Sequence, residues 1–326
     1  MEKILTVSVA AYNVEKYLRN TLSTLADSRY VDKLEVFVVD DGGKDQSLAI
    51  AKEFEEKYPG TFHAVHKENG GYGSTVNYSI QHAAGEFFKL LDGDDWMNRD
   101  GLNEVLNRLP DCKEDAVVTD YLSGPDEEHL EVVPCRREDG DVVSVKEYET
   151  SYPHGMWSLF YRISVLKASG VVLPEHTLYT DQIYSTVPFA KIDSIRFYKV
   201  PVYCYRFGRE EQSTSRNSRI KHADEMLRVC RELFAFYEKN GTGNQYLLSR
   251  VSRYYAVAVK TLLLFPVNRK NRDRIKKYEQ NMKVRYPEIY KKAVENNMMG
   301  KFIRLMRRTS YCSYWLLKLL PGKYLG

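Results

Sequence analysis

The sequence has few cysteines and no long apolar segment. Its 326 residues include five cysteines, which are scattered along the chain and form no C-x-x-C pair. This pattern argues against a disulfide framework or a cysteine zinc site and favours a reducing compartment. No apolar run is long enough to span a bilayer. The apolar stretch at residues 4–11 is too short for a signal peptide and follows the acidic Glu2. We therefore expect a cytoplasmic protein.

Positive charge is concentrated at the C-terminal end. Residues 266–326 hold 16 Lys/Arg and 4 Asp/Glu, whereas residues 1–265 hold 32 and 40. Apolar residues recur there at near-helical spacing: Phe302, Leu305, Met306, Leu316, Leu319 and Leu320. This pattern predicts a basic amphipathic helix, so residues 299–326 are expected to touch an anionic membrane peripherally, on the inner face of the cell membrane. The alternative is a terminal helix that packs on the protein with its basic face in solvent. No nucleic-acid partner is expected, because no nucleic-acid motif accompanies the charge.

Strand and helix patterns alternate over the first hundred residues. Apolar or β-rich runs occupy 4–10, 34–39, 61–66 and 86–91, and helical spacing occupies 14–25, 46–58 and 74–84. This order predicts an α/β fold with a mostly parallel sheet, helices on both faces and right-handed connections. Residues 113–216 show mixed patterns, with strands expected at 117–121, 131–133 and 195–207. From about residue 217 the pattern is helical.

Polar or glycine-rich segments follow each of the first four predicted strands. The segments are Ala11-Tyr12-Asn13, Asp40-Asp41-Gly42-Gly43, Asn69-Gly70-Gly71-Tyr72-Gly73 and Asp92-Gly93-Asp94-Asp95. In open α/β sheets, ligands bind beyond the carboxyl ends of the strands. The four segments together therefore predict one binding site at this edge of the sheet.

The fourth segment has the composition of a metal–diphosphate site. Asp92 and Asp94 lie two residues apart at a strand end, which points both carboxylates to one side. Hard oxygen ligands of this kind hold Mg²⁺ or Mn²⁺, and such a cation neutralises a leaving diphosphate. Asp95 is a third acid, and Gly93 lets a bulky group approach the backbone. The alternative is a solvated turn, since Asp and Gly are ordinary turn residues. The three matching strand ends favour the metal site.

Four ordered motifs resemble those of family 2 glycosyltransferases. They are VSVAAYN at 7–13, VVDDGGKDQS at 38–47, the segment from Asn69 to Asn77, and LDGDDW at 91–96. The resemblance implies a GT-A fold, a nucleotide-sugar donor (most often a UDP-sugar), Mn²⁺ or Mg²⁺, and inversion at the anomeric carbon. The Gln-x-x-Arg-Trp motif of the processive synthases is absent, so single additions are expected.

The resemblance also assigns roles by position. The implied donor-binding residues are Ala10, Tyr12, Asp40, Asp41, Gly70, Gly71, Asn77, Asp92, Gly93, Asp94 and Arg206. Asp92, Asp94 and Asp95 would bind the metal, and Asp181 would be the catalytic base. His154 and Trp157 would lie on the acceptor side. The alternative for Asp181 is an acid favoured by a helix N-terminus, and for Arg206 an exposed basic turn.

These roles divide the chain into three expected parts. Residues 1–112 form the nucleotide-sugar-binding half of the GT-A domain, 113–216 its acceptor-binding half, and 217–326 a helical region with the basic tail. The acceptor is expected to be a hydroxyl of a lipid-linked or surface-polysaccharide glycan. Two other functions stay open. A metal-dependent nucleotidyltransferase would favour a basic, glycine-rich loop after the first strand, which the chain lacks. A non-catalytic carbohydrate-binding protein would not need to keep the aspartates.

Overall fold

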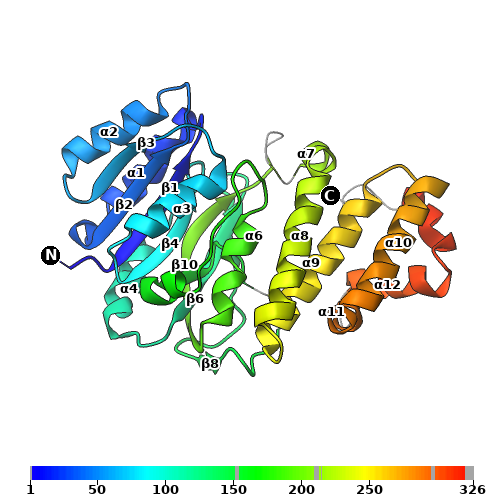
Figure 1. The fold of residues 1–326 in the computed structure, drawn as a ribbon. Coiled ribbons are helices and arrows are strands. Elements are labelled where there is room, and N and C mark those ends of the chain that lie inside the picture. The colour runs from blue at the N-terminus through cyan, green and yellow to red at the C-terminus, as the bar shows by residue number, and fades with distance from the viewer. Residues whose placement is uncertain (1, 151–153, 209–212, 214, 295–297, 320–326) are drawn as a thin grey trace. The chain divides into compact units, whose positions relative to one another are not determined.

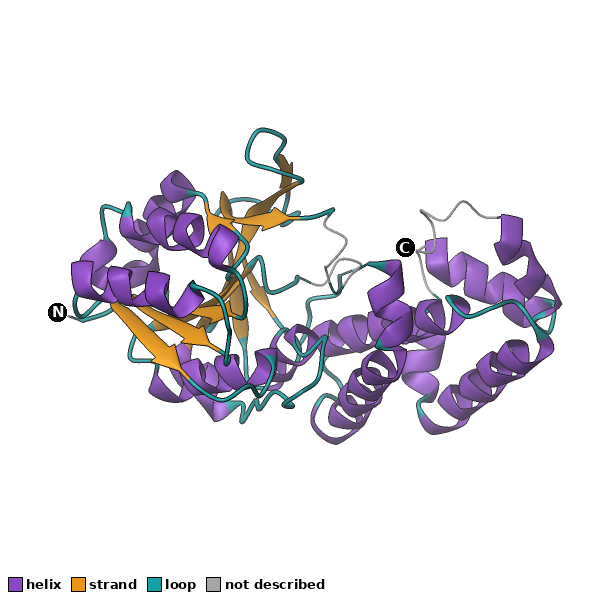
Figure 2. Ribbon diagram, turned by 90° about the horizontal axis from the view of Figure 1, so that it is seen from above, coloured by secondary structure: helices purple, strands orange, loops and turns teal. Residues whose placement is uncertain are grey.

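The computed structural model describes the chain except for residues 1, 151–153, 209–212, 214, 295–297 and 320–326. The chain forms two compact units (Figure 1). The first comprises Met1–Val145 and His154–Gly208, and the second comprises Lys146–Pro153 and Arg209–Gly326. In Figure 2 the strands lie in the first unit, and the second is drawn as helices and loops. The sheet of the first unit therefore carries any site at strand ends.

The described part of the first unit contains one ten-stranded sheet, whose central path runs β3-β2-β1-β4-β9-β6-β10-β5. The bounds are β1 Leu5–Ala11, β2 Leu34–Asp40, β3 Phe62–His66, β4 Phe87–Asp92, β5 Trp96–Met97, β6 Ala116–Gly124, β7 Glu131–Val133, β8 Val142–Ser144, β9 Leu159–Arg162 and β10 Ser194–Arg206. Strands β3, β2, β1 and β4 are mutually parallel, and β6 pairs parallel with β10. Strand β9 is antiparallel to both of its neighbours. The predicted mostly parallel α/β sheet is confirmed.

The helices of the first unit follow from the apolar spacing of the sequence. Their bounds are α1 Glu15–Ala26, α2 Ser47–Lys57, α3 Tyr72–His82, α4 Arg99–Arg108, α5 Ile163–Ala168 and α6 Asp181–Tyr184, with 3-10 turns at η1 Val31–Lys33, η2 Leu109–Asp111 and η3 Val187–Ala190. In α1, for example, Leu18, Leu22 and Leu25 recur on one face and are fully buried. The right-handed crossovers place α1 and α2 on one face of the sheet and α3 on the other.

Register brings the ends of the first strands together. Ala10 pairs with Asp92 across β1 and β4, and Ala11 pairs with Asp40 across β1 and β2. Asp40 in turn pairs with His66 at the end of β3. The polar segments that follow these strands therefore leave the sheet at one edge, as the sequence predicts.

The second unit is helical over its described residues. Its elements are α7 Arg216–Lys221, α8 Ala223–Asn240, α9 Gln245–Leu263, α10 Arg269–Arg285, α11 Pro287–Lys292, α12 Met298–Arg308 and η4 Cys312–Leu319. The segment Lys146–Pro153, which lies in sequence between the two parts of the first unit, also belongs to the second unit. There, Tyr148 stacks on Tyr246 with ring centroids 5.4 Å apart, and the Gln245 amide donates to the Lys146 carbonyl at 3.3 Å.

Helix α12 packs part of its apolar face inside the second unit. Ile303 and Met306 are fully buried, and the Arg307 guanidinium donates to buried Glu279 at 2.6 Å. Leu305, by contrast, is 44% exposed. The burial of Ile303 and Met306 therefore agrees with the alternative prediction, a terminal helix that packs on the protein. Leu320 and the side chains at 316 and 319 lie outside the described residues. Among the residues that the structure describes, no helix is both long and apolar enough to cross a bilayer.

Candidate functional site

Three carboxylates gather where β4 ends. Asp92 closes β4, and Asp94 and Asp95 lie in the turn before β5. One carboxylate oxygen from each lies within 4.8 Å of the others. Asp92 and Asp94 are half-buried, whereas Asp95 is buried. Several hard oxygen donors this close together suit Mg²⁺ or Mn²⁺.

Asp95 is held from inside the protein. Its Oδ2 accepts the Tyr203 hydroxyl at 2.6 Å, and its Oδ1 accepts the Arg206 amide at 2.8 Å. Burial, together with the charge of Asp92, raises the pKa of Asp95 to about 8. Both carboxylate oxygens of Asp95 therefore hold the turn between β4 and β5 against β10. Asp92 and Asp94 are the more accessible carboxylates of the cluster.

Gly93 is explained by packing within the chain. Its amide donates to the Ala10 carbonyl at 3.1 Å, and a Cβ at this position would lie 2.7 Å from that same oxygen. The glycine thus allows the turn to close onto β1. Diphosphate approach, the reason suggested by the sequence, is not needed to account for it.

Asp41 organises the loop after β3. Its Oδ1 accepts from Lys67 Nζ at 2.8 Å and from the Gly70 amide at 2.9 Å. Its Oδ2 accepts from the Gly71 amide at 2.7 Å and from Asn69 Nδ2 at 3.0 Å. The residue is only 3% exposed. Neighbouring Asp40 is buried as well, and its Oδ2 meets His66 Nδ1 at 2.7 Å. Both acids thus shape the site by holding its loops.

Replacing Asp41 with alanine is expected to lower the free energy of unfolding by about 3 kcal/mol, because two backbone amides and an ammonium lose their acceptor. Urea denaturation measures this loss. Asp45→Ala is the matched control, because Asp45 also accepts two backbone amides, those of Glu15 and Ser47, but at a more exposed position. A loss for Asp41→Ala no larger than that for Asp45→Ala would contradict the assignment.

The glycine-rich loop holds a second loop, at residues 171–180. The Gly70 carbonyl accepts the His176 amide at 2.7 Å, and a Cβ at Gly73 would lie 2.5 Å from the Pro174 carbonyl. The Asn77 side chain donates to the Leu173 carbonyl at 2.8 Å and accepts the Leu173 amide at 2.9 Å. Gly70 and Asn77, predicted as donor-binding residues, thus hold the 171–180 loop, and a Cβ at Gly71, also predicted to bind the donor, would lie 3.0 Å from the His176 amide nitrogen.

Asp181 follows this held loop as the first residue of α6. The loop is strained, since His176 and Tyr179 have φ angles of 47° and 65°. Asp181 is half-buried, and its Oδ2 accepts Gln182 Nε2 at 2.7 Å. The catalytic-base candidate therefore has a fixed place relative to the glycine loop.

Tyr72 connects the two acidic parts of the site. Burial raises the pKa of its hydroxyl well above the usual range, and the nearby Asp92 and Asp181 carboxylates raise it further. Its hydroxyl also donates to Met156 Sδ at 3.5 Å. The sequence alone predicts no role for Tyr72. The only available signal was an aromatic residue inside a loop otherwise built of small and polar residues.

Arg206 lies beside the carboxylate turn. Its Nε donates to the Asp94 carbonyl at 3.4 Å, and its guanidinium lies over the rings of Trp96, at 4.7 Å, and Tyr17, at 5.3 Å. Arg206 is thus held beside the carboxylate turn, and these contacts differ from those expected of an isolated, exposed basic turn. Tyr12, by comparison, is 53% exposed at the end of β1.

The two acceptor-side candidates differ in their surroundings. His154 is buried with its ring edge-on to Phe197, at a centroid distance of 5.5 Å. Trp157 is half-buried and packs against Tyr121 at 5.6 Å and Tyr205 at 4.8 Å. His154 therefore has the setting of a packing residue, whereas Trp157 belongs to a half-exposed aromatic group.

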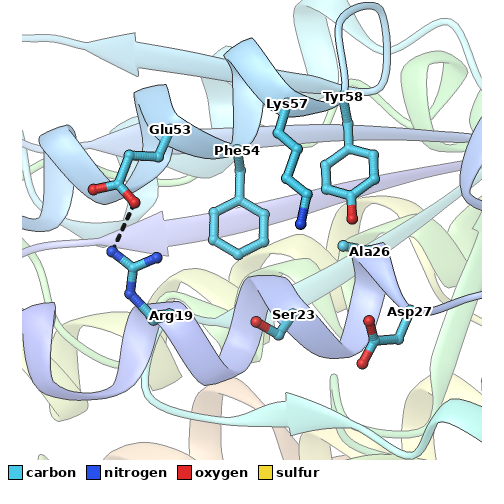
Figure 3. A pocket seen from close by; sticks show the side chains of 8 residues that line it. All are labelled: Arg19, Ser23, Ala26, Asp27, Glu53, Phe54, Lys57 and Tyr58. Atoms are coloured by element: carbon cyan, nitrogen blue, oxygen red, sulfur yellow. Dashed lines mark hydrogen bonds and ion pairs between the residues drawn. The ribbon is translucent and has the colours of Figure 1, made fainter.

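A hollow of about 180 Å³ between α1 and α2 lies away from these residues (Figure 3). It is lined by Arg19, Ser23, Ala26, Asp27, Glu53, Phe54, Lys57 and Tyr58. Asp27 and Tyr58 are the C-caps of the two helices. The C-terminal ends of crossover helices lie toward the amino ends of the strands, so this hollow is not part of the carboxylate site.

Comparison with known proteins points to one family. Residues 6–164 match the sequence model described as glycosyl transferase family 2. EpsH of Bacillus subtilis, named as a glycosyltransferase, is 29% identical over 214 residues, which are 61% of this chain and 59% of EpsH. The chain thus spans less than two thirds of that relative. The poly(ribitol-phosphate) beta-N-acetylglucosaminyltransferase TarS of Staphylococcus aureus is 25% identical over 64% of this chain and 36% of its own length.

Solved structures show the same fold. The structure of S. aureus TarS 1-349 with UDP-GlcNAc has a TM-score of 0.65 at 19% identity and covers 93% of this chain and 92% of that chain. The mannosyltransferase PcManGT from Pyrobaculum calidifontis, with GDP-Man and Mn²⁺, has a TM-score of 0.51 at 18% identity, covering 96% and 88%. The GT-A-type fold expected from the sequence is confirmed, together with the helical C-terminal region.

Proposed function

We propose that this chain, which belongs to glycosyl transferase family 2 through residues 6–164, moves one sugar from a nucleotide-sugar donor to a hydroxyl acceptor. The observation that carries the proposal is the carboxylate cluster of Asp92, Asp94 and Asp95, with oxygens within 4.8 Å of one another, at the strand edge that also bears Tyr12 and the glycine loop. A leaving nucleoside diphosphate needs such a site, since its developing charge must be neutralised.

Asp92 and Asp94 would hold a divalent cation, with Asp95 fixing their turn from behind. Mn²⁺ and Mg²⁺ both suit carboxylate oxygens. When bound, the cation would neutralise charge on the donor's diphosphate. The guanidinium of Arg206, which lies beside Asp94, adds a second positive charge that can pair with a phosphate oxygen.

The donor base would lie over the end of β1. Tyr12 is exposed there and can stack on a base, and the half-buried Ala10 leaves room beneath. Asp41 is proposed to act through the loop it holds, because its carboxylate already accepts several hydrogen bonds. UDP is the proposed nucleotide, in keeping with the UDP-GlcNAc in the TarS structure.

Asp181 is the proposed general base. It would take the proton from the acceptor hydroxyl as that oxygen attacks the anomeric carbon. Attack from the face opposite the leaving diphosphate inverts the configuration at that carbon. The acceptor is proposed to be a lipid-linked or surface-polysaccharide glycan, with the aromatic group around Trp157 on its side.

Release of the nucleoside diphosphate from nucleotide-sugars tests the function. Purified protein would be incubated with UDP-GlcNAc, UDP-glucose, UDP-galactose or GDP-mannose, each with Mn²⁺, Mg²⁺ or EDTA. We expect one donor to be hydrolysed slowly with metal and not with EDTA. Failure of every donor with both metals would reject the proposal.

Membrane contact is also proposed for the basic C-terminal region. The proposed surface differs from the apolar face of the amphipathic helix that the sequence predicts in residues 299–326. A hollow of about 240 Å³ is lined by Val267, Asn268, Arg269, Arg272, Tyr311, Cys312, Tyr314 and Trp315. Trp315 is 57% exposed, and the Arg269 side chain is 89% exposed. Two guanidiniums beside an exposed indole suit an anionic lipid surface, although Asp273 lies 3.4 Å from Arg272 and 3.9 Å from Arg269 and partly neutralises both.

Reversing one charge in this hollow should weaken vesicle binding. Arg269→Glu changes the local charge by two, and each basic residue near an anionic bilayer contributes about 1 kcal/mol. We expect about a tenfold or greater loss of pelleting with vesicles containing phosphatidylglycerol, and no pelleting with phosphatidylcholine alone. Lys52→Glu, an exposed reversal in the first unit, is the matched control. Equal pelleting of Arg269→Glu and wild type would reject this surface.

A further inference from the structure

A buried lysine lies in β4, the strand that ends at Asp92. Lys89 is in β4, three residues before Asp92, between Phe88 and Leu90, and its exposed fraction is 0%. Burial lowers the pKa of its ammonium well below the usual range, while the charge of Asp92 opposes that shift. A buried charge is costly unless it is paired or well hydrogen-bonded, and an apolar side chain would serve packing better.

The Lys89 ammonium holds one turn of the first unit. Its Nζ donates to the Met156 carbonyl at 2.7 Å and to the Trp157 carbonyl at 2.6 Å. It also lies 4.8 Å from the centroid of the Phe160 ring and 5.1 Å from that of Tyr203. The interactions of Lys89 are thus with the backbone of this turn and with two aromatic faces.

The turn at Met156 and Trp157 contacts Tyr72, which lies near both a proposed metal ligand and the proposed base. Met156 Sδ accepts the hydroxyl of Tyr72, the residue whose hydroxyl is influenced by Asp92 and Asp181. Trp157 packs on Tyr121 and Tyr205. Tyr203, under the Lys89 ammonium, donates to Asp95 at 2.6 Å and accepts the Asp92 amide at 3.2 Å. Lys89 therefore contacts Tyr203, which bonds to Asp92 and Asp95, and the turn whose Met156 accepts the Tyr72 hydroxyl.

We infer that Lys89 is a positioning residue, which fixes the Met156–Trp157 turn relative to β4 and so sets the placement of Tyr72 between Asp92 and Asp181. This inference rests on the proposed function. Lys89 touches no substrate. Its removal should therefore affect the catalytic step more than donor binding, because a misplacement of about 1 Å can cost about 10²-fold in rate.

The test is Lys89→Met, which keeps an unbranched side chain, one heavy atom shorter, and removes its donors. With a UDP-sugar that the wild type hydrolyses in Mn²⁺, we expect kcat to fall about 10- to 100-fold while KM for the donor changes less than about threefold. In a Trp96→Phe/Trp315→Phe background, the emission of Trp157 should shift to the red, because its turn loosens. Lys167→Met is the matched control. Lys167 also donates to two backbone carbonyls, those of Gln81 and Ala83, but it is exposed.

Three results would overturn the inference: unchanged kcat in folded Lys89→Met, a rise in KM that accounts for the whole loss, or an equal loss in Lys167→Met. If Lys89→Met does not fold, Met156→Leu takes its place, since it removes only the sulfur acceptor of Tyr72. A several-fold fall in kcat then supports the positioning role, and an unchanged kcat rejects it. If wild type hydrolyses no donor, the proposed function fails. The Trp157 emission shift still decides whether Lys89 fixes the turn.

Discussion

Replacing Asp94 with alanine is expected to abolish Mn²⁺-dependent binding of UDP and to lower turnover by about 10³-fold or more. A bound cation contributes several kcal/mol of charge stabilisation when a diphosphate leaves, and about 1.4 kcal/mol corresponds to a tenfold change in rate. Asp94 is half-buried in the turn after β4, so its truncation leaves no buried charge without a partner in the core. The fold should persist. Calorimetry with UDP, with and without Mn²⁺, measures the binding.

Asp100→Ala is the control for this experiment. Asp100 lies in α4, close in sequence, and its side chain is 85% exposed. UDP binding by this variant should match wild type. If Asp94→Ala also bound UDP as tightly as wild type in Mn²⁺, the metal would have to be held elsewhere and the cluster would lose its assigned role.

Changing Asp181 to asparagine is expected to preserve donor binding and to lower the rate about 10²- to 10⁴-fold. An amide keeps the size of the side chain but cannot accept the proton of the attacking hydroxyl. Because α6 starts at Asp181 after a loop held by Gly70 and Asn77, the substitution should leave the surrounding backbone in place. UDP affinity and UDP-sugar hydrolysis, measured on the same preparation, separate the two effects.

Glu175→Gln provides the comparison in the same loop, since Glu175 is exposed. It should retain the rate of wild type. Substantial turnover by Asp181→Asn would remove Asp181 as the base, and a parallel loss of UDP affinity would show that the residue supports the donor site. Together with Asp94→Ala, this variant distinguishes loss of donor binding from loss of transfer.

The sheet and the location of the site could be predicted because they depend on local patterns. Apolar runs and helical spacing fixed β1 to β4 and α1 to α3 within a few residues, and the carboxyl ends of parallel strands necessarily meet at one edge. Asp92 and Asp94 are predicted as candidate metal ligands from their spacing and their sequence context alone. Such features need no knowledge of tertiary contacts.

The roles of supporting residues could not be predicted in this way. Asn77 bonds to Leu173, 96 positions away in sequence, and Tyr203 reaches Asp95 across 108 positions. Lys89 is recognisable in the sequence as the one charged residue between Phe87 and Leu91, but its partners at 156 and 157 come from another part of the chain. Whether a carboxylate faces a ligand or a backbone amide depends on these distant contacts.

The segment at 146–153 has a consequence for synthesis on the ribosome. It lies between two stretches of the first unit but belongs to the second. Its Tyr148, only 6% exposed in the finished protein, stacks on Tyr246, which is translated almost a hundred residues later. The nascent first unit must therefore emerge with an apolar side chain still awaiting its partner. A chain terminated after residue 208 lacks Tyr246 and should expose the ring of Tyr148, which adds apolar surface that promotes aggregation.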